Sequence, residues 1–171
     1  MSAGWSKRRD IDPLADGQAR FDFAIPLADF ARLRPQLAAV GDDLATGSVA
    51  FLRDQGFAAA DLEVRASMPL ACQRCLGVVR YEVSERSHVL LIGTEPEADR
   101  TPAGMDTVLA PDGRVSVQDL VEEELLLSVP AVPLHASPEE CVARPAQAEP
   151  AEESTVQRPF ERLGELLKRN K

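Results

Sequence analysis

Residues 57–92, FAAADLEVRASMPLACQRCLGVVRYEVSERSHVLLI, contain two long segments whose patterns predict β-strands. In the first, Phe57–Leu70, apolar and polar side chains alternate from Leu62 to Met68, as they do along a strand that buries one face. The second, Val78–Ile92, begins with the same alternation. Two such segments joined by a short connection predict an antiparallel pair.

The connection between these segments is ACQRCLG, residues 71–77. It places the thiols of Cys72 and Cys75 three positions apart, at the expected tip of a hairpin. Farther along the second strand, the alternation falters at Glu85–Ser87, which predicts a bulge or a break in the pairing.

The rest of the chain predicts an α+β fold, in which two helices pack on a mainly antiparallel sheet of five or six strands. Apolar residues recur every three or four positions over residues 27–40, which predicts a helix with a kink or an early end at Pro35. A second helix is expected between Ser116, which can cap its N-terminus, and Pro130. Further strands are expected at residues 18–26, 47–53, 107–109 and 114–117.

A carboxylate interrupts the apolar face of the second helix. At 100° per residue, Glu124 falls in the middle of the face that is formed by Val117, Val121 and their apolar neighbours. A carboxylate in that position needs a partner. It is either paired with an arginine of the sheet or a functional group, whereas Glu122 and Glu123 are expected in solvent.

Composition divides the chain into four parts. Residues 1–17 predict an N-terminal arm, and residues 18–135 predict a single domain. Residues 136–158 are rich in Ala, Pro, Glu and Ser, which predicts a flexible linker. Residues 159–171 predict an amphipathic helix.

One apolar stripe of this C-terminal helix contains Phe160, Leu163 and Leu167. An apolar stripe of this kind is expected to be buried against another surface, and two such surfaces are considered. The helix can pack on its own domain, or it can enter the groove of another protein.

The formal net charge of −9 over 171 residues is unevenly distributed. Residues 1–90 carry 11 Lys and Arg against 12 Asp and Glu, whereas residues 91–171 carry 8 against 16. An acidic surface repels phosphate backbones, so composition argues against a general nucleic-acid binder. Without a long apolar run or a signal-like N-terminus, the protein is expected to be cytoplasmic, not membrane-bound, with reduced cysteines.

The CxxC pair supplies half of a tetrahedral zinc site. Among the remaining residues, His88, His135 and Cys141 can complete it, and Cys72, Cys75, His135 and Cys141 give a Cys₃His set. Two alternatives stay open: free thiols at an ordinary hairpin tip, and a redox pair. The redox reading is disfavoured because a redox CxxC normally opens a helix after a strand.

The sequence contains no recognisable catalytic centre. It lacks the GxGxxG, GxxxxGK[ST] and GxSxG motifs. Consecutive glutamates at 122–124 diverge by 100° each and cannot converge on one metal ion of a nuclease. We therefore expect no enzyme activity and no small-molecule substrate.

Four arginines could form a basic patch on the polar side of the sheet and at the hairpin tip. Salt-bridged surface positions are the alternative, and no aromatic pattern of an RNA-binding sheet accompanies them. These arginines are Arg65, Arg74, Arg80 and Arg86.

Three motifs together resemble the YceD family of large ribosomal RNA subunit accumulation proteins. They are ACQRCLG at 71–77, DLVEEELLLSVPAVPLH at 119–135 followed by Cys141, and RPFERLGELLKRNK at 158–171. The resemblance covers roughly residues 10–171.

The resemblance implies a non-enzymatic role in the synthesis, processing or stability of 23S rRNA, and thus in large-subunit assembly. It also implies a possible metal site, which falls on the Cys₃His set named above. The partner would be a large-subunit rRNA precursor or a basic ribosomal protein. The alternative is an acidic adaptor for other proteins, with or without a stabilising zinc ion, that has no direct ribosomal role.

Overall fold

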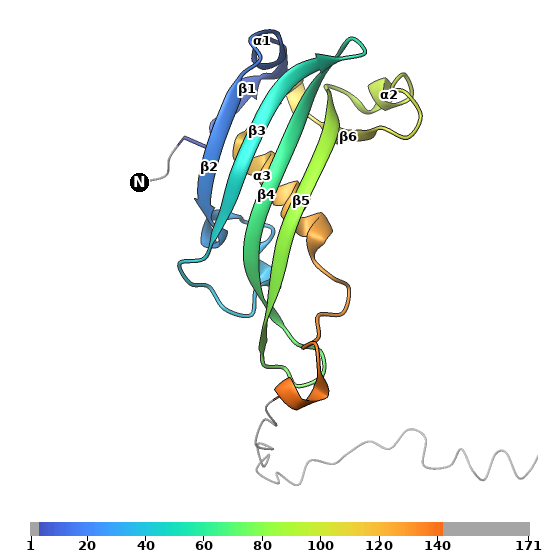
Figure 1. Ribbon diagram of the computed structural model, residues 1–171. Coiled ribbons are helices and arrows are strands. Elements are labelled where there is room, and N and C mark those ends of the chain that lie inside the picture. The colour runs from blue at the N-terminus through green and yellow to red at the C-terminus, as the bar shows by residue number, and fades with distance from the viewer. Residues whose placement is uncertain (1–3, 142–171) are drawn as a thin grey trace, which may run out of the picture.

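Five strands form the main sheet, in the spatial order β2-β3-β4-β5-β6 (Figure 1). Neighbouring strands are antiparallel from β2 to β5, and β6 pairs parallel to β5. This arrangement comes from a computed structural model, which describes residues 4–141. The strands are β2 Arg20–Pro26, β3 Leu44–Asp54, β4 Phe57–Ala71, β5 Val78–Ile92 and β6 Asp106–Leu109.

The β4–β5 hairpin is the longest element of the fold and confirms the predicted strand pair. Its register is continuous from Ala58↔Leu91 to Ala71↔Val78. The expected bulge at Glu85–Ser87 is therefore wrong. The alternation falters there because Glu85 is exposed, although it lies opposite the buried Val64.

Residues 27–40 do not form the predicted helix. They contain two 3-10 turns, Leu27–Asp29 and Arg34–Gln36, and we call the whole segment the strap. Pro35 removes one backbone donor, and other N–H groups pair outside the segment instead. The Leu27 N–H donates to the Asp43 carbonyl at 2.8 Å, and the Ala38 N–H donates to the Pro69 carbonyl at 2.8 Å.

The apolar spacing of the strap nevertheless has a structural cause. Phe30 and Leu33 are completely buried, whereas Val40 is half exposed. Apolar side chains at three-residue spacing can thus anchor an irregular segment as well as a helix, and helix prediction from this spacing alone failed.

The second predicted helix is confirmed as α3, Val117–Ser128. The Ser116 hydroxyl caps it by accepting the Asp119 N–H at 3.0 Å. The helix ends at Ser128, and the extended backbone of Val129 caps it before Pro130, whose ring cannot continue it. Figure 1 shows α3 crossing one face of the sheet.

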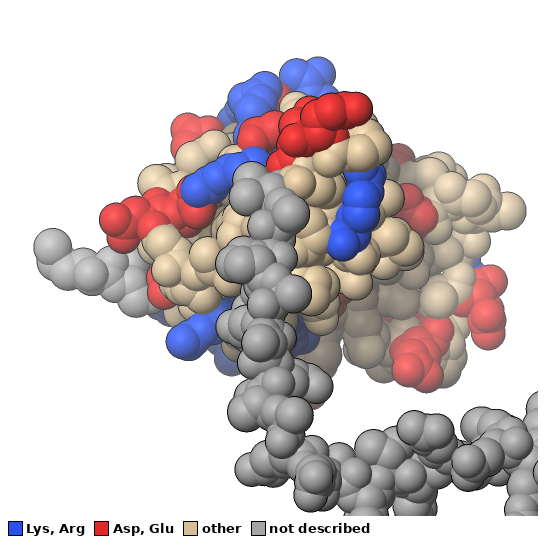
Figure 2. Space-filling view, turned by 90° about the horizontal axis from the view of Figure 1, so that it is seen from below, with Lys and Arg blue, Asp and Glu red and all other residues tan. Residues whose placement is uncertain are grey.

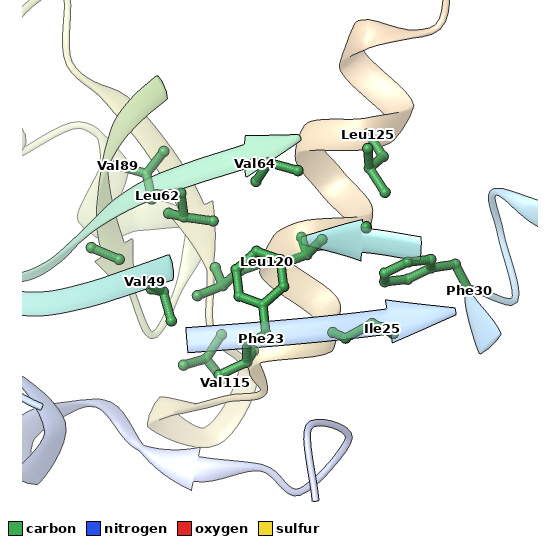
Figure 3. Close-up of a cluster of buried hydrophobic side chains, with 14 of the residues drawn as sticks. Phe23, Ile25, Phe30, Val49, Leu62, Val64, Val89, Val115, Leu120 and Leu125 are labelled. Atoms are coloured by element: carbon green, nitrogen blue, oxygen red, sulfur yellow. The ribbon is translucent and has the colours of Figure 1, made fainter. Parts of the chain in front are cut away.

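The core lies between this face of the sheet and α3 (Figure 3). Leu120 and Leu125 of α3 meet buried side chains of the strands, among them Phe23 and Val64. The helix covers only one face of the sheet. Along β3, β4 and β5, the alternate side chains that point to the other face are more exposed. The α+β class and the mainly antiparallel sheet are therefore confirmed.

Short elements complete the described chain. Residues 9–16 lie in the region expected to be an arm, yet Ile11, Leu14 and Ala15 are buried in the core. No helix between residues 4 and 141 combines the length and hydropathy that a membrane span requires. The short elements are β1 Arg9–Asp10, which pairs with β7 Arg114–Val115, and the helices α1 Ile11–Asp16 and α2 Glu95–Ala98.

Candidate metal centre

The tip of the β4–β5 hairpin is a tight turn that places Cys72 and Cys75 close together. The Cys72 N–H donates to the Gly77 carbonyl, and the Leu76 N–H donates to the Cys72 carbonyl, both at 2.8 Å. Leu76 has a φ of 59°, in the left-handed region, which lets the chain reverse within these few residues. The predicted position of the CxxC at the tip is confirmed.

The segment after α3 brings His135 to this tip. The Gln73 N–H donates to the Pro133 carbonyl at 2.8 Å, which joins the two segments through the backbone. Arg74 Nη2 donates to the His135 carbonyl at 3.4 Å. These contacts join residues that are 60 positions apart in the sequence.

Cys141 reaches the cluster through a 3-10 turn, Pro138–Glu140. Its N–H donates to the Pro138 carbonyl at 3.1 Å. This turn lies within the predicted linker, residues 136–158, of which residues 142–158 are outside the described residues. The predicted C-terminal helix, with Phe160, Leu163 and Leu167, also lies outside them.

The structure brings all four predicted ligands together. One ligand atom from each of Cys72, Cys75, His135 and Cys141 lies within 4.8 Å of the others. His135 Nδ1 is 3.6 Å from the Sγ atoms of both Cys75 and Cys141. Zinc bonds of about 2.0–2.3 Å in a tetrahedron separate nitrogen and sulfur ligands by about 3.5 Å, so this cluster could hold a metal ion.

The histidine is also oriented as a metal ligand. Its Nε2 lies 3.2 Å from the Val78 carbonyl and donates a proton to it. Nδ1, on the cluster side, is then the nitrogen without a proton. Metal-binding histidines commonly fix their tautomer by such a hydrogen bond to a backbone carbonyl.

The three thiols are free and differ in their surroundings. Burial works to raise the pKa of the Cys72 thiol, but N–H groups of Cys75, Arg74 and His135 lower it to about 5. Burial, together with the neighbouring Cys75 and Cys72 side chains, raises the pKa of Cys141 to about 11. A cation at the centre of the cluster would favour the thiolate form of all three.

The donor set belongs to a structural type of site. Three cysteines and one histidine fill all four positions of a tetrahedron and leave none for a substrate or water. Such a site would join the hairpin tip to the segment after α3, because each of these parts supplies two ligands.

The four predicted interaction arginines do not form one free basic patch. Arg65 and Arg86 both pair with Glu63, Arg86 at 3.2 Å, and Arg80 pairs with Asp43 at 2.6 Å. Arg74 lies apart from them at the hairpin tip. Where Figure 2 shows side chains of the described part, basic and acidic groups are interspersed.

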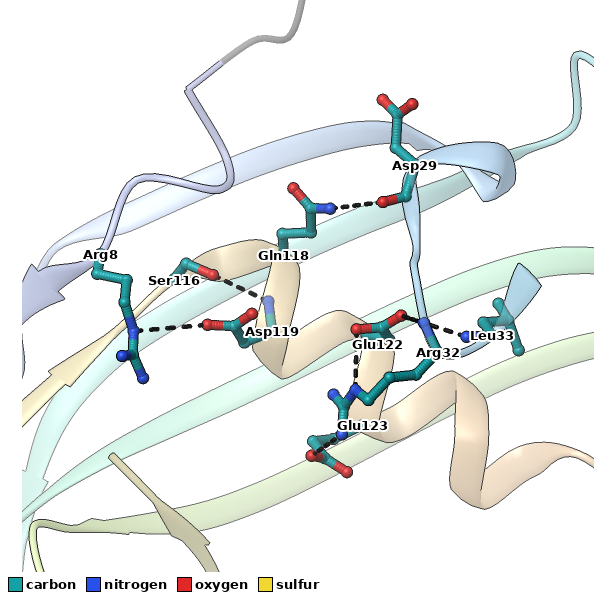
Figure 4. A network of polar contacts seen from close by, with 9 residues as sticks. All are labelled: Arg8, Asp29, Arg32, Leu33, Ser116, Gln118, Asp119, Glu122 and Glu123. Atoms are coloured by element: carbon teal, nitrogen blue, oxygen red, sulfur yellow. Dashed lines mark hydrogen bonds and ion pairs between the residues drawn. The ribbon is translucent and has the colours of Figure 1, made fainter. Parts of the chain in front are cut away.

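Glu122 is the buried carboxylate of α3, with 6% of its surface exposed. It accepts the N–H groups of Arg32 at 2.6 Å and Leu33 at 3.2 Å, and it pairs with Arg32 Nε at 3.1 Å (Figure 4). Glu123 pairs with Arg32 Nη1 at 2.6 Å. The expectation that these two glutamates are only solvated is therefore wrong.

The reason for this error is the strap, which packs beside α3 and exposes backbone donors to Glu122. Residues 27–40 were expected to form a helix, and no sequence pattern indicates that their backbone N–H groups contact Glu122. Glu124, expected on the buried face, is half-buried, and its carboxylate accepts no hydrogen bond from the described residues, although its carbonyl accepts the Ser128 hydroxyl at 2.8 Å.

His88, a second histidine considered for the metal site, lies outside the cluster. Its Nδ1 is 2.6 Å from Asp61 Oδ1, and its Nε2 is 3.1 Å from Asp54 Oδ2. The hydrogen bond to Asp61 raises the His88 pKa; burial opposes this shift, and Asp54 adds to it. The His88 ring therefore links two carboxylates, and its protonated form makes this link stronger.

This arrangement predicts a pH-dependent contribution to stability. His88 gains protonation on folding, so its contribution is fully present below the unfolded pKa of about 6.5 and is lost as pH rises through the folded pKa. In urea unfolding, wild type should exceed His88→Asn in free energy of unfolding by up to about 1 kcal/mol at pH 5.5, and by less at pH 8.5. A gap that widens with pH would contradict this assignment.

The comparison with known families agrees with these features. A model of the family described as large ribosomal RNA subunit accumulation protein YceD matches residues 60–167. The match includes all four residues of the cluster and the whole of α3. No solved structure matches the chain. Since the match covers more than half of the sequence, the chain belongs to the YceD family.

Proposed function

We propose that this protein supports accumulation of 23S rRNA as a non-catalytic factor of large-subunit assembly, and that it does so by binding a basic ribosomal protein. Membership in the YceD family supports a ribosome-related role. The proposal about the partner rests on the charge of the folded part.

The observation that carries it is an excess of carboxylates over cations. Residues 4–141 carry 13 Lys and Arg against 23 Asp and Glu, a formal net charge of −10. The sheet arginines that could contact RNA pair with carboxylates, as Arg80 does with Asp43. Opposite potentials speed the encounter with a basic partner and disfavour phosphate backbones.

Two further observations support a role without catalysis. Glu122 and Glu123 are engaged by Arg32, so they are not free to hold a divalent ion for hydrolysis of RNA. The Cys₃His cluster has a full set of four protein ligands.

We further propose that the cluster binds one zinc ion. Three thiolates and an imidazole are ligands that zinc prefers, and the 3.6 Å separations suit its tetrahedral geometry. Zinc would order the hairpin tip and the segment around His135 and Cys141 as one surface. That surface, at the end of the molecule, would then be available to a partner in a fixed shape.

The test is sedimentation of cell extracts through sucrose gradients, following the tagged protein and the rRNA species of each fraction. The proposal predicts that the protein migrates with large-subunit precursors, is absent from mature ribosomes, and is released as salt is raised. If the protein still sediments with its partner after RNase treatment, and salt still releases it, the contact is with a protein and not with RNA. Protein that stays at the top of the gradient, with normal rRNA after depletion, would refute the ribosomal role and favour the adaptor alternative.

A further inference from the structure

A groove runs between α3 and strand β6, and it consists of two adjoining hollows. The first, about 470 Å³, is lined by Arg8, Arg114 and neighbouring residues. The second, about 410 Å³, is lined by Glu124, Leu127 and others. The two share Val108, Leu109 and Glu123 as lining residues, and together we call them the α3–β6 groove.

The two ends of the groove differ in charge. Arg8 and Arg114 lie at the end near the start of α3, where they form only exposed ion pairs, with Asp119 at 3.9 Å and Asp10 at 3.1 Å. Such exposed pairs contribute little and exchange partners easily. At the other end, Asp106 and Glu124 form no ion pair with any of the described residues.

The groove also exposes apolar surface. Leu127 is 80% exposed and Leu109 is 45% exposed. The Ser87 hydroxyl in the second hollow is buried and has no hydrogen-bond partner among the described residues. Leucines on a groove wall beside an unpartnered hydroxyl indicate a surface that another segment covers.

Residues 158–171, which lie outside the described part, have the matching sequence. Arg158, Glu161, Arg162 and Glu165 come first and carry no net charge, and the cations Lys168, Arg169 and Lys171 follow. Apolar residues recur between them at positions 160, 163 and 167. As a helix, the last 13 residues would be about 20 Å long, with one apolar stripe and a basic end.

We propose that this C-terminal segment docks in the α3–β6 groove of its own chain. Its basic end lies toward Glu124 and Asp106 of the second hollow. The apolar stripe covers Leu109 and Leu127. This inference does not rest on the proposed ribosomal role.

The connecting chain is long enough. From Cys141 at the hairpin tip, residues 142–157 can extend over about 55 Å. The path from the tip to β6 follows β5, whose 15 residues span about 46 Å. The segment can therefore reach both hollows without displacing the cluster.

Photo-crosslinking of the full-length protein tests the docking. With p-benzoylphenylalanine in place of Phe160, irradiation should give an adduct within one chain, and mass spectrometry should place it on residues that line the groove, such as Val108 or Leu109. An adduct elsewhere on the domain, an adduct between two chains, or no adduct would overturn the proposal.

Charge exchange tests the orientation in the same protein. Glu124→Lys should lower the yield of the groove adduct at least severalfold, and adding Lys168→Glu should restore it. Asp22→Lys is the matched control, because Asp22 is exposed on β2, at the opposite edge of the sheet, and should leave the yield unchanged. An equal yield in Glu124→Lys and wild type would refute the proposed orientation.

Discussion

Replacing Cys72 with serine is expected to abolish stoichiometric zinc binding and to lower the thermal midpoint by about 10 °C. Cys72 is the one ligand of the cluster that is completely buried, and its backbone closes the hairpin turn through the Gly77 carbonyl. A serine hydroxyl is a poor zinc ligand at neutral pH, and the remaining three ligands would hold the ion far more weakly.

The measurement is metal content by mass spectrometry together with calorimetric melting of the purified full-length protein. Wild type should contain about one zinc per chain and the variant less than about 0.2. Gln73→Ala is the matched control: it changes the same turn, at a side chain whose one hydrogen bond within residues 4–141 is to the Ala71 carbonyl. Substoichiometric metal in wild type, with the same melting in Cys72→Ser, would mean that the tip is an ordinary turn with free thiols.

The second large effect is expected from Glu122→Ala, which should reduce the free energy of unfolding by about 3 kcal/mol. The substitution leaves the N–H groups of Arg32 and Leu33 without their acceptor, and Leu33 is completely buried. It also removes the buried partner of the Arg32 guanidinium. Unsatisfied donors at a buried contact cost more than the loss of the methylene groups alone.

Glu124→Ala is the matched control, two positions along the same helix. Since the Glu124 carboxylate has no hydrogen bond or ion pair with the described residues, its removal should change stability by less than about 0.5 kcal/mol. Denaturant unfolding of both variants decides between the two glutamates. A larger loss in Glu124→Ala than in Glu122→Ala would contradict the contact between the strap and α3.

The elements that the sequence predicted correctly are those with a strong local signal. Strict alternation marked β4, and a cap together with a proline marked both ends of α3. The four residues of the cluster could also be predicted, because the chain has only three cysteines and two histidines, and His135 lies close to Cys141 in the sequence.

The strap could not be predicted, because its conformation depends on contacts distant in sequence. Its apolar spacing resembles that of a helix, but Ala38 donates to a carbonyl of β4 and Leu27 donates to one just before β3. The wrong expectation for residues 27–40 also affected α3. Helical periodicity alone places Glu124 on the buried face. Glu122 is the buried glutamate instead, because the adjacent strap supplies hydrogen-bond donors to its carboxylate. The ion pairs of the sheet arginines likewise depend on which strands are neighbours.

The proposed role of the ordered, metal-binding tip is to support accumulation of large-subunit rRNA without catalysis. Its most direct test is the ratio of 23S to 16S rRNA in cells whose only copy of the protein carries Cys72→Ser, at a protein level matched to Gln73→Ala cells. In Cys72→Ser cells this ratio is expected to fall nearly as far as in a deletion strain, and in Gln73→Ala cells it should stay unchanged. A normal ratio in cells that contain the metal-free variant would contradict this proposed role.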